Sequence, residues 1–441
     1  MTDRPTPGRP FGWVSATALV VANMIGAGIF TTSGFALADL GSRPRVMAAW
    51  LVGGIIALCG AVSYGGLVRR MAVSGGEYLF LSRVIHPGAG FLAGWVSLLA
   101  GFTGAIAFAA TVFETYVVPE SVRPAWLPAG AVGISAIVVC GALHGIVVRY
   151  GVRAQNAVVL LKLLFLVGFV GFALIRFGDT GWPGLGVPGP AAAFSLTAFA
   201  TSLVWISLSY SGFNAAVYVA GEIEDAPRSA PRALWLGTSI VVAIYLVLNA
   251  VFLYVPLPEN VAGRPDVAAA AAEALGGGGV STVLRIVISL ALLSSVSSMI
   301  VAGPRVYARM ARDKVFPAFL AGPDDGQGSR APLASITLQV VLAAIVVSVS
   351  GLSALLSYLG FVLSMSAAGT VACLFVLRHR EGKSVVAGIG YPLVPGIFIV
   401  ATVTLGLLAA TQRPREWFAA VITLLSGLLA YRILNRGGKP D

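Results

Sequence analysis

Two short glycine-containing stretches interrupt apolar segments that are otherwise long enough to cross a bilayer. The first contains Gly26 and Gly28, and the second is Ser209-Tyr210-Ser211-Gly212. Glycine costs about 1 kcal/mol in a helix interior, and backbone groups freed at membrane depth persist only where they line a cavity or meet protein. Paired interruptions in two halves of a chain indicate a transporter binding site. Close helix packing is the alternative role for either stretch alone.

An unwound membrane helix offers a ligand both kinds of backbone group. The half-helix after the break exposes N–H groups and a positive dipole end, and the half before it exposes carbonyls. An amino acid zwitterion matches this pair, with its carboxylate on the N–H groups and its ammonium on the carbonyls. The expected substrate-binding residues are Met24, Ile25, Gly26, Ala27, Gly28, Ile29, Leu208, Ser209, Tyr210, Ser211 and Gly212.

Lys162 is a charged residue well inside a predicted span, with apolar neighbours on every side of the helix. An intramembrane lysine costs about 2.5 to 3.5 kcal/mol on insertion scales and by default marks a function. We expect its ammonium to replace a coupling metal ion at the carbonyls freed by the first break, and to bind and release protons. The hydroxyls expected beside it belong to Ser294, Ser295, Ser297 and Ser298. Snorkelling along the helix to the interface is the alternative.

The composition places the chain in a membrane. Of 441 residues, 57% are hydrophobic and 11% are charged, which is far more apolar than a soluble protein. The apolar runs suit helices of about 20 residues rather than barrel strands of about 10. We expect twelve spans, near residues 13–38, 47–68, 88–117, 128–148, 155–176, 194–220, 233–256, 282–304, 332–350, 353–377, 391–411 and 416–434.

The distribution of positive charge predicts the orientation. If both ends face the cytoplasm, 20 of the 29 Lys and Arg residues fall on that side and 8 on the other, as the positive-inside rule requires. The net charge of +11 therefore reports topology. Nucleic-acid binding is not expected, because no soluble segment carries a basic patch with aromatic platforms. The expected location is the inner (plasma) membrane, with cytoplasmic tails at residues 1–12 and 435–441.

The spans divide into two five-helix units, residues 13–176 and 194–377, followed by two further helices in residues 391–434. Each unit begins with a broken helix, and five spans per unit give the units opposite orientations, so we expect an inverted repeat. A linker with its own helical signal lies between the second and third helices of each unit. One starts at Ser74 and ends near Ile85, and the other runs from Asp266 to Leu275. Such linkers are candidate gate elements or ordinary surface helices.

Other common sites are not expected. Cys59, Cys140 and Cys373 fall within spans, which excludes a disulfide framework. The three histidines lack metal-ligand spacing, and no hydrolase, metalloprotease or Walker motif occurs. Glu114 and Glu222 lie near span ends, where water or headgroups can solvate them. We therefore expect no enzyme activity, no metal and no cofactor.

Several motifs resemble the amino acid, polyamine and organocation transporter superfamily, in the branch of the L-type amino acid transporters and their bacterial relatives. Gly26-Ala27-Gly28-Ile29-Phe30 stands where that family has Gly-Ser-Gly-Ile-Phe, and Ser74-Gly75-Gly76-Glu77-Tyr78 matches its first cytoplasmic loop. Further similar stretches are Tyr210–Asn214, Ala226–Ala233, Gly303–Arg305 and Phe316-Pro317. The resemblance covers nearly the whole chain.

The resemblance implies the leucine-transporter fold, alternating access and a substrate held between helices 1 and 6. It also places Lys162 on a lysine that several relatives use in place of a sodium ion. Two positions depart from the family pattern. Ala27 replaces a common serine, so that a hydroxyl is lost while the backbone donors remain. Leu208 stands where relatives usually have an aromatic gate, so we expect Trp205 or Phe213 to take that role, or a looser gate.

The sequence thus predicts a sodium-independent transporter or exchanger of neutral L-amino acids in the lipid bilayer. No buried carboxylate is available for a cationic substrate side chain. The alternatives are a proton-coupled carrier of cationic amino acids or polyamines, and a sensor that binds amino acids without transport. Eukaryotic L-type members bind a single-span partner through a cysteine after the third helix. Residues 118–128 contain no cysteine, so no disulfide-linked accessory subunit is expected.

Overall fold

The computed structural model describes residues 12–146, 151–177, 181–187, 193–312, 315–321, 333–382 and 390–434. The described residues contain no β-strand. Eight of their helices are long and apolar enough to cross a membrane, and four shorter apolar helices accompany them. The all-helical membrane class is therefore confirmed, while the count of twelve spans and the inverted repeat remain predictions. The expected tails lie outside the described residues, except for residue 12.

The helices of the first half follow the predicted spans closely. They are α1 Trp13–Met24, η1 Gly28–Phe30, α2 Thr32–Leu40, α3 Arg43–Arg70, α4 Gly76–Val84, α5 Pro87–Val96, η2 Ser97–Gly104, α6 Ala105–Val117, η3 Glu120–Val122, α7 Ala131–Ile146 and α8 Gly151–Phe177. The segment expected as one helix over 88–117 contains a π-helical stretch, η2, between α5 and α6. Such stretches interrupt the regular hydrogen-bond ladder of a helix.

The second half also contains both long and broken helices. Its elements are α9 Leu196–Ser209, α10 Ala215–Tyr218, η4 Ala220–Glu222, α11 Ala226–Tyr254, η5 Pro258–Asn260, α12 Val267–Arg312, η6 Ala318–Leu320, α13 Leu333–Val349, α14 Leu352–Glu381, α15 Leu393–Ala410 and α16 Pro414–Leu434. Gly276 and Gly277 have non-helical backbone angles inside α12. The linker helix expected over 266–275 is therefore separated by a kink from the long apolar helix after it.

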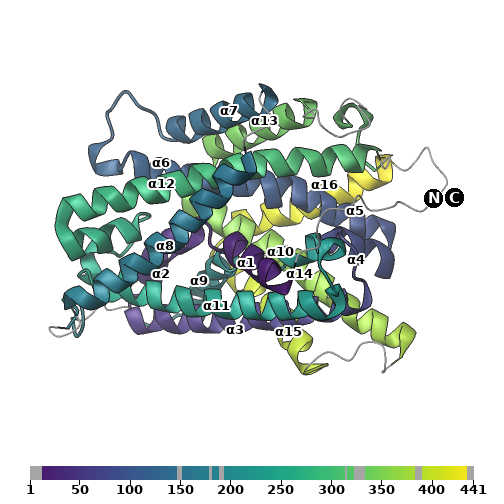
Figure 1. The fold of residues 1–441 in the computed structure, drawn as a ribbon, viewed down its shortest axis with the longest axis horizontal. Helices are drawn as coiled ribbons and strands as arrows, with labels where there is room; N and C mark the ends of the chain where they lie inside the picture. Colours follow the sequence, from purple (N-terminus) through teal and green to yellow (C-terminus); the bar gives the residue numbers. More distant parts are fainter. Residues whose placement is uncertain are drawn as a thin grey trace.

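The core forms around close contacts between helices. In Figure 1, α3 and α11 run side by side along one edge of the molecule, α7 and α13 lie along the opposite edge, and α1 lies between these edges. Small residues on α3 permit this packing. A methyl group added at Gly53 would lie 2.6 Å from Ile206 of α9, and one at Gly54 would lie 2.8 Å from Val242 of α11.

Glu114 corrects one expectation from the sequence. Its side chain is buried and ion-paired, instead of being solvated by water or headgroups. Arg123 lies 2.6 Å away, and the N–H groups of Gly130 and Gly133 donate to the carboxylate at 2.8 and 2.9 Å. The loop after α6 folds back to supply the cation, because a buried carboxylate needs a partner.

Candidate functional site

Both interruptions predicted from the sequence are present in the structure. Helix α1 ends at Met24, residues 25–27 are not helical, and the 3₁₀ turn η1 begins at Gly28. Helix α9 ends at Ser209, and a turn over 210–214 leads to α10. Gly212 has a φ of 94°, which favours glycine. Each apolar segment therefore consists of two short helical parts joined by non-helical backbone.

The two breaks lie directly against each other. The Thr32 and Ser209 hydroxyls are 2.9 Å apart, and the Asn23 amide donates to the Gly212 carbonyl at 3.4 Å. A methyl group added at Gly28 would lie 2.8 Å from the Ser209 Cα atom, and one at Gly212 would lie 3.0 Å from the Asn23 carbonyl oxygen. These glycines allow the two backbones to approach closely. The close packing that was the alternative role therefore occurs at the same place as the predicted substrate site.

The first break leaves backbone donors available. Among the described hydrogen bonds, none is donated by the N–H groups of Ala27, Gly28 or Ile29. Gly26 is half-buried, and a methyl group added there would meet one atom within 4 Å, the Met24 carbonyl oxygen at 3.9 Å. Open space therefore adjoins the unpaired donors. The other expected residues of the first break, Met24, Ile25, Ala27 and Ile29, are buried.

Two of the expected substrate-binding residues, Met24 and Ser209, have carbonyls that already accept a protein donor. The Tyr245 hydroxyl of α11 lies 2.7 Å from the Met24 oxygen and 3.2 Å from the Ser209 oxygen. Tyr245 therefore joins the two breaks, a role that the sequence analysis missed. Nothing in the sequence of α11 distinguishes Tyr245 from an ordinary core aromatic residue. Each carbonyl has two lone pairs, so a ligand ammonium can still bind beside the tyrosine.

We expect Tyr245→Phe to reduce transport about five- to tenfold. The variant keeps the buried ring but removes a hydroxyl shared by two carbonyls, and a typical hydrogen bond contributes about 0.5–1.5 kcal/mol. The measurement is the rate of labelled amino acid exchange at equal amounts of reconstituted protein. Tyr358→Phe is the control, because the Tyr358 hydroxyl bonds Thr423, 2.9 Å away, between α14 and α16. Equal exchange rates for Tyr245→Phe and the wild type would exclude this joining role.

Lys162 reaches the first break from α8. Its side chain is 6% exposed, and its ammonium donates to the Ile25 carbonyl at 2.5 Å. This geometry disagrees with snorkelling, which requires the ammonium to reach water or headgroups. An ammonium thus donates to one carbonyl that the break has freed.

The four serines of α12 are not bonded to Lys162 in the described part of the chain. Ser295 and Ser298 donate to carbonyls of their own helix, at Ala291 and Ser294. Ser297 lies 2.7 Å from the His144 ring of α7. Their predicted place beside the lysine therefore has no support from the geometry, while their part in coupling stays a prediction.

The candidate gate residues point to different parts of the molecule. Trp205 is buried between Phe35 of α2, with ring centroids 6.2 Å apart, and Ser357 of α14, which accepts from the indole N–H at 2.7 Å. Phe213 packs edge-on against Tyr64 and Phe398. In the second break, Leu208 is buried, and the Ser211 N–H donates to its carbonyl at 3.0 Å. The buried Tyr210 hydroxyl donates to the Trp50 carbonyl at 3.1 Å.

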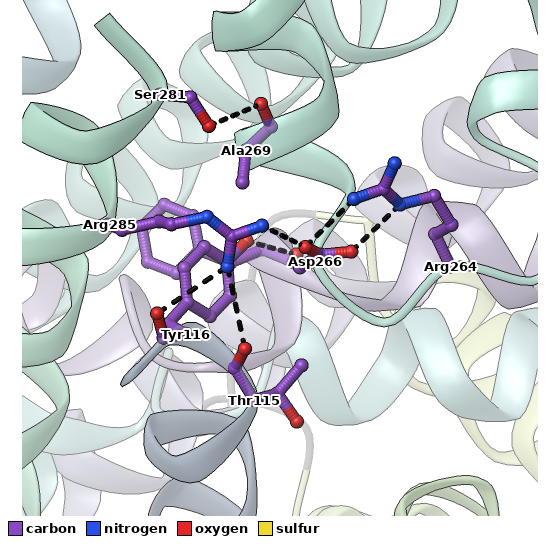
Figure 2. Close-up of polar contacts among 8 residues, drawn as sticks. Thr115, Tyr116, Arg264, Asp266, Ala269, Ser281 and Arg285 are labelled. Atoms are coloured by element: carbon purple, nitrogen blue, oxygen red, sulfur yellow. Dashed lines mark hydrogen bonds and ion pairs between the residues drawn. The ribbon is translucent and has the colours of Figure 1, made fainter. Parts of the chain in front are cut away.

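A charged cluster connects η1, which follows the first break, to Asp266 at the start of the linker helix. Figure 2 shows the Asp266 carboxylate between two guanidinium groups. Arg264 donates twice to it, at 2.9 and 3.0 Å, and Arg285 forms a further ion pair. Arg285 also donates to the Tyr116 carbonyl at 3.4 Å, and the Tyr116 hydroxyl donates to the Phe30 carbonyl at 2.9 Å. Contacts therefore run from η1 through α6 and α12 to the linker.

The pKa of Asp266 reflects this cluster. Burial alone would raise it, but the hydrogen bonds and charges of Arg264 and Arg285 outweigh burial and hold it below its ordinary value of 3.8. A carboxyl group with a lowered pKa stabilises the fold above its unfolded pKa, and this stabilisation is lost as the pH falls through its folded pKa. The cluster therefore stays ionised at neutral pH.

A cavity of about 650 Å³ lies on another side of α1, between α8 and α11. Thr17 is the polar side chain of its lining, and the remaining lining residues are apolar, including Trp13, Leu163 and Ile244. A zwitterion needs charged or polar partners. This cavity therefore does not suit an amino acid, and the breaks remain the candidate site.

Comparisons with known proteins agree with this architecture. A family model described as amino acid permease matches residues 11–429. Asc-type amino acid transporter 1 of Mus musculus is 24% identical over 97% of this chain and 81% of its own length. Large neutral amino acids transporter small subunit 2 of Homo sapiens is 25% identical over 85% and 70%. The serine/threonine exchanger SteT of Bacillus subtilis is 24% identical over 89% and 88%.

These relatives are transporters and not enzymes, and the matched region includes both breaks, Lys162 and the charged cluster. The match extends over nearly the whole chain, as the resemblance of the sequence motifs indicated. The chain is a multi-pass membrane protein that belongs to the amino acid permease family, in the amino acid, polyamine and organocation transporter superfamily.

Proposed function

We propose that this protein exchanges neutral L-amino acids across the inner membrane, independently of sodium, by alternating access. The observation that carries the proposal is the set of unpaired N–H groups at Ala27, Gly28 and Ile29, next to open space at Gly26. Backbone donors at a positive helix end bind a carboxylate without any charged side chain. The substrate carboxylate binds there, and its ammonium binds beside the carbonyls that end α1 and α9.

Two features support neutral substrates and sodium independence. Residues 13–38 and 194–220 contain no Asp or Glu, so neither broken segment offers a carboxylate to a cationic substrate side chain. The Lys162 ammonium donates to the Ile25 carbonyl, which is the type of ligand that a sodium ion would need at this break. Lys162 serves as a fixed cation and organises the break for the substrate.

Closure on the two sides of the site involves different groups. Trp205 lies between α2 and α14, and in this proposal it separates the break from the outer side. In this proposal the side rich in Lys and Arg is cytoplasmic. The two five-helix units are inverted repeats that move relative to each other, and no covalent accessory subunit is required.

Exchange in proteoliposomes tests the proposal. We expect uptake of labelled neutral amino acids to rise at least tenfold when unlabelled amino acid is present inside, and to stay the same when sodium is replaced by choline. Uptake without internal substrate that follows an inward proton gradient would replace exchange by symport. Preferential uptake of lysine, arginine or polyamines would favour the cationic carrier. Binding without flux would make the protein a sensor and would contradict transport.

A further inference from the structure

A carboxyl group at the junction of four elements has no cationic partner among the described residues. Glu77, in the first turn of α4, accepts from the Tyr64 hydroxyl of α3 at 2.6 Å and from the Asn214 amide at 3.0 Å. Its second oxygen accepts from the Ser366 hydroxyl of α14 at 2.6 Å. Asn214 directly precedes α10, the half-helix after the second break. One carboxyl group therefore connects α4 to α3, to α14 and to the residue that directly precedes α10.

The titratable groups around Glu77 are neutral, or are engaged elsewhere. Besides Tyr64, the ring of Tyr218 on α10 packs against Gly76. On α3 and α14, Arg70 pairs with Glu381 at 2.6 Å, and Arg380 donates to the Val84 carbonyl at 2.7 Å. At the start of α5, His86 accepts from the Gly88 N–H at 3.0 Å. In the part of the chain that the structure describes, no ion pair therefore fixes the charge of Glu77.

The protonated and ionised forms of Glu77 make different bonds. The ionised form accepts three hydrogen bonds, and bonds to an ionised group are roughly twice as strong as neutral ones. When a proton binds, the Ser366 hydroxyl can rotate to become the acceptor, so the neutral form keeps the same neighbours. Burial raises the pKa of Glu77 above its ordinary value of 4.5, and the three hydrogen bonds oppose this effect only in part.

We propose that Glu77 binds a proton and thereby controls whether the site opens toward the cytoplasmic side. We call the contacts of Glu77 with α3, Asn214 and α14 the inner gate. Opening of the inner side moves α10 and α14 away from α4 and exposes the carboxyl group to water. The closed arrangement therefore binds the proton more tightly than the open one. By linkage, protons stabilise the closed gate, and opening releases the proton to the cytoplasmic side. This inference rests on the proposed function and its orientation, and it places proton binding at a group other than the fixed cation Lys162.

The pH profile of exchange tests the proposal in proteoliposomes with the same pH on both sides. We expect wild-type exchange to fall at least threefold between pH 8 and pH 5, and Glu77→Gln to remove this fall. Glutamine mimics the neutral form, because its oxygen accepts from Tyr64 and Asn214 while its amide donates to Ser366. Ser366→Ala removes a donor that stabilises the charge and shifts the wild-type inflection to higher pH.

Glu381→Gln is the matched control, because Glu381 is a partly exposed carboxylate that pairs with Arg70. It should keep the wild-type profile. Identical profiles for the wild type, Glu77→Gln and Ser366→Ala would overturn the proposal. A merely structural role of Glu77 would lower the rate at every pH without moving the inflection.

Thermal unfolding in detergent tests the proton site without transport. A carboxyl group with a raised pKa stabilises the fold fully below its unfolded pKa, about 4.5, and this stabilisation is lost as the pH rises through its folded pKa. We expect the melting temperature of the wild type to fall relative to that of Glu77→Gln between pH 4.5 and pH 8. Asp266 affects both proteins equally. If the melting temperatures follow this trend but the protein transports no amino acid, the proposed function is refuted while the proton-binding site at Glu77 is supported.

Discussion

Replacing Lys162 by alanine should abolish amino acid exchange, by at least 100-fold, in a protein that still inserts into the membrane. The lysine is almost fully buried, and its ammonium donates to the Ile25 carbonyl at 2.5 Å. Without it, this carbonyl loses a charged donor at the point where α1 has ended, and an unsatisfied buried group costs about 1–3 kcal/mol, with more for charged groups. Insertion should improve, because an intramembrane lysine itself costs about 2.5 to 3.5 kcal/mol.

Initial rates of exchange, normalised to the amount of protein in the vesicles, measure this effect. Gly168→Ala is the control on the same helix, since no atom lies within 4 Å of the added methyl group. It should exchange at the wild-type rate. Normal exchange and an unchanged pH profile in Lys162→Ala would show that Lys162 has no role in transport, as the snorkelling alternative holds.

The sequence predicted the breaks and Lys162 because each depends on local composition. Glycines in an apolar run weaken a helix wherever the run packs, and a lysine deep within such a run has few places to put its charge. The bond from Lys162 to Ile25 follows from these two features and the freed carbonyls. This part of the candidate site could therefore be predicted before the fold was known.

The partners of the freed carbonyls could not be predicted in the same way. Tyr245 reaches Met24 and Ser209 because of the rotation of α11 about its axis, which is set by packing against α1 and α3. The contacts of the α12 serines could not be predicted for a related reason. Residues 294, 295, 297 and 298 lie on one half of the helix at about 100° per residue, but which neighbour that half meets depends on packing, and Ser297 contacts His144 on α7.

Ion pairs made by residues in the loops between helices could not be predicted from the sequence either. Glu114 meets Arg123 and Asp266 meets Arg285, through loops whose paths depend on the positions of several helices. The surroundings of the two gate candidates likewise needed the structure, since Trp205 contacts Phe35 whereas Phe213 contacts Tyr64. Helix periodicity identifies the apolar face of each helix, but it does not identify the helix that packs against that face.

The second large effect is expected for Gly28→Ala, at the contact between the two breaks. The added methyl group would lie 2.8 Å from the Ser209 Cα atom and 2.9 Å from its Cβ atom, closer than Cβ atoms approach backbone. Overpacking of this kind costs about 1–3 kcal/mol. Because the variant must push α9 away from η1, it should lower exchange at least tenfold and weaken substrate binding.

Gly26→Ala is the matched control for the fold, because its methyl group meets only the Met24 carbonyl oxygen, 3.9 Å away. It should express and melt as the wild type does, whereas Gly28→Ala should melt at a lower temperature. Since Gly26 borders the space assigned to the substrate, its methyl group should raise the KM for exchange. The two glycines are two residues apart but test different roles. Gly28→Ala tests the close approach of the two backbones, and Gly26→Ala tests the space assigned to the substrate. Wild-type exchange in Gly28→Ala would show that the breaks need not touch for transport.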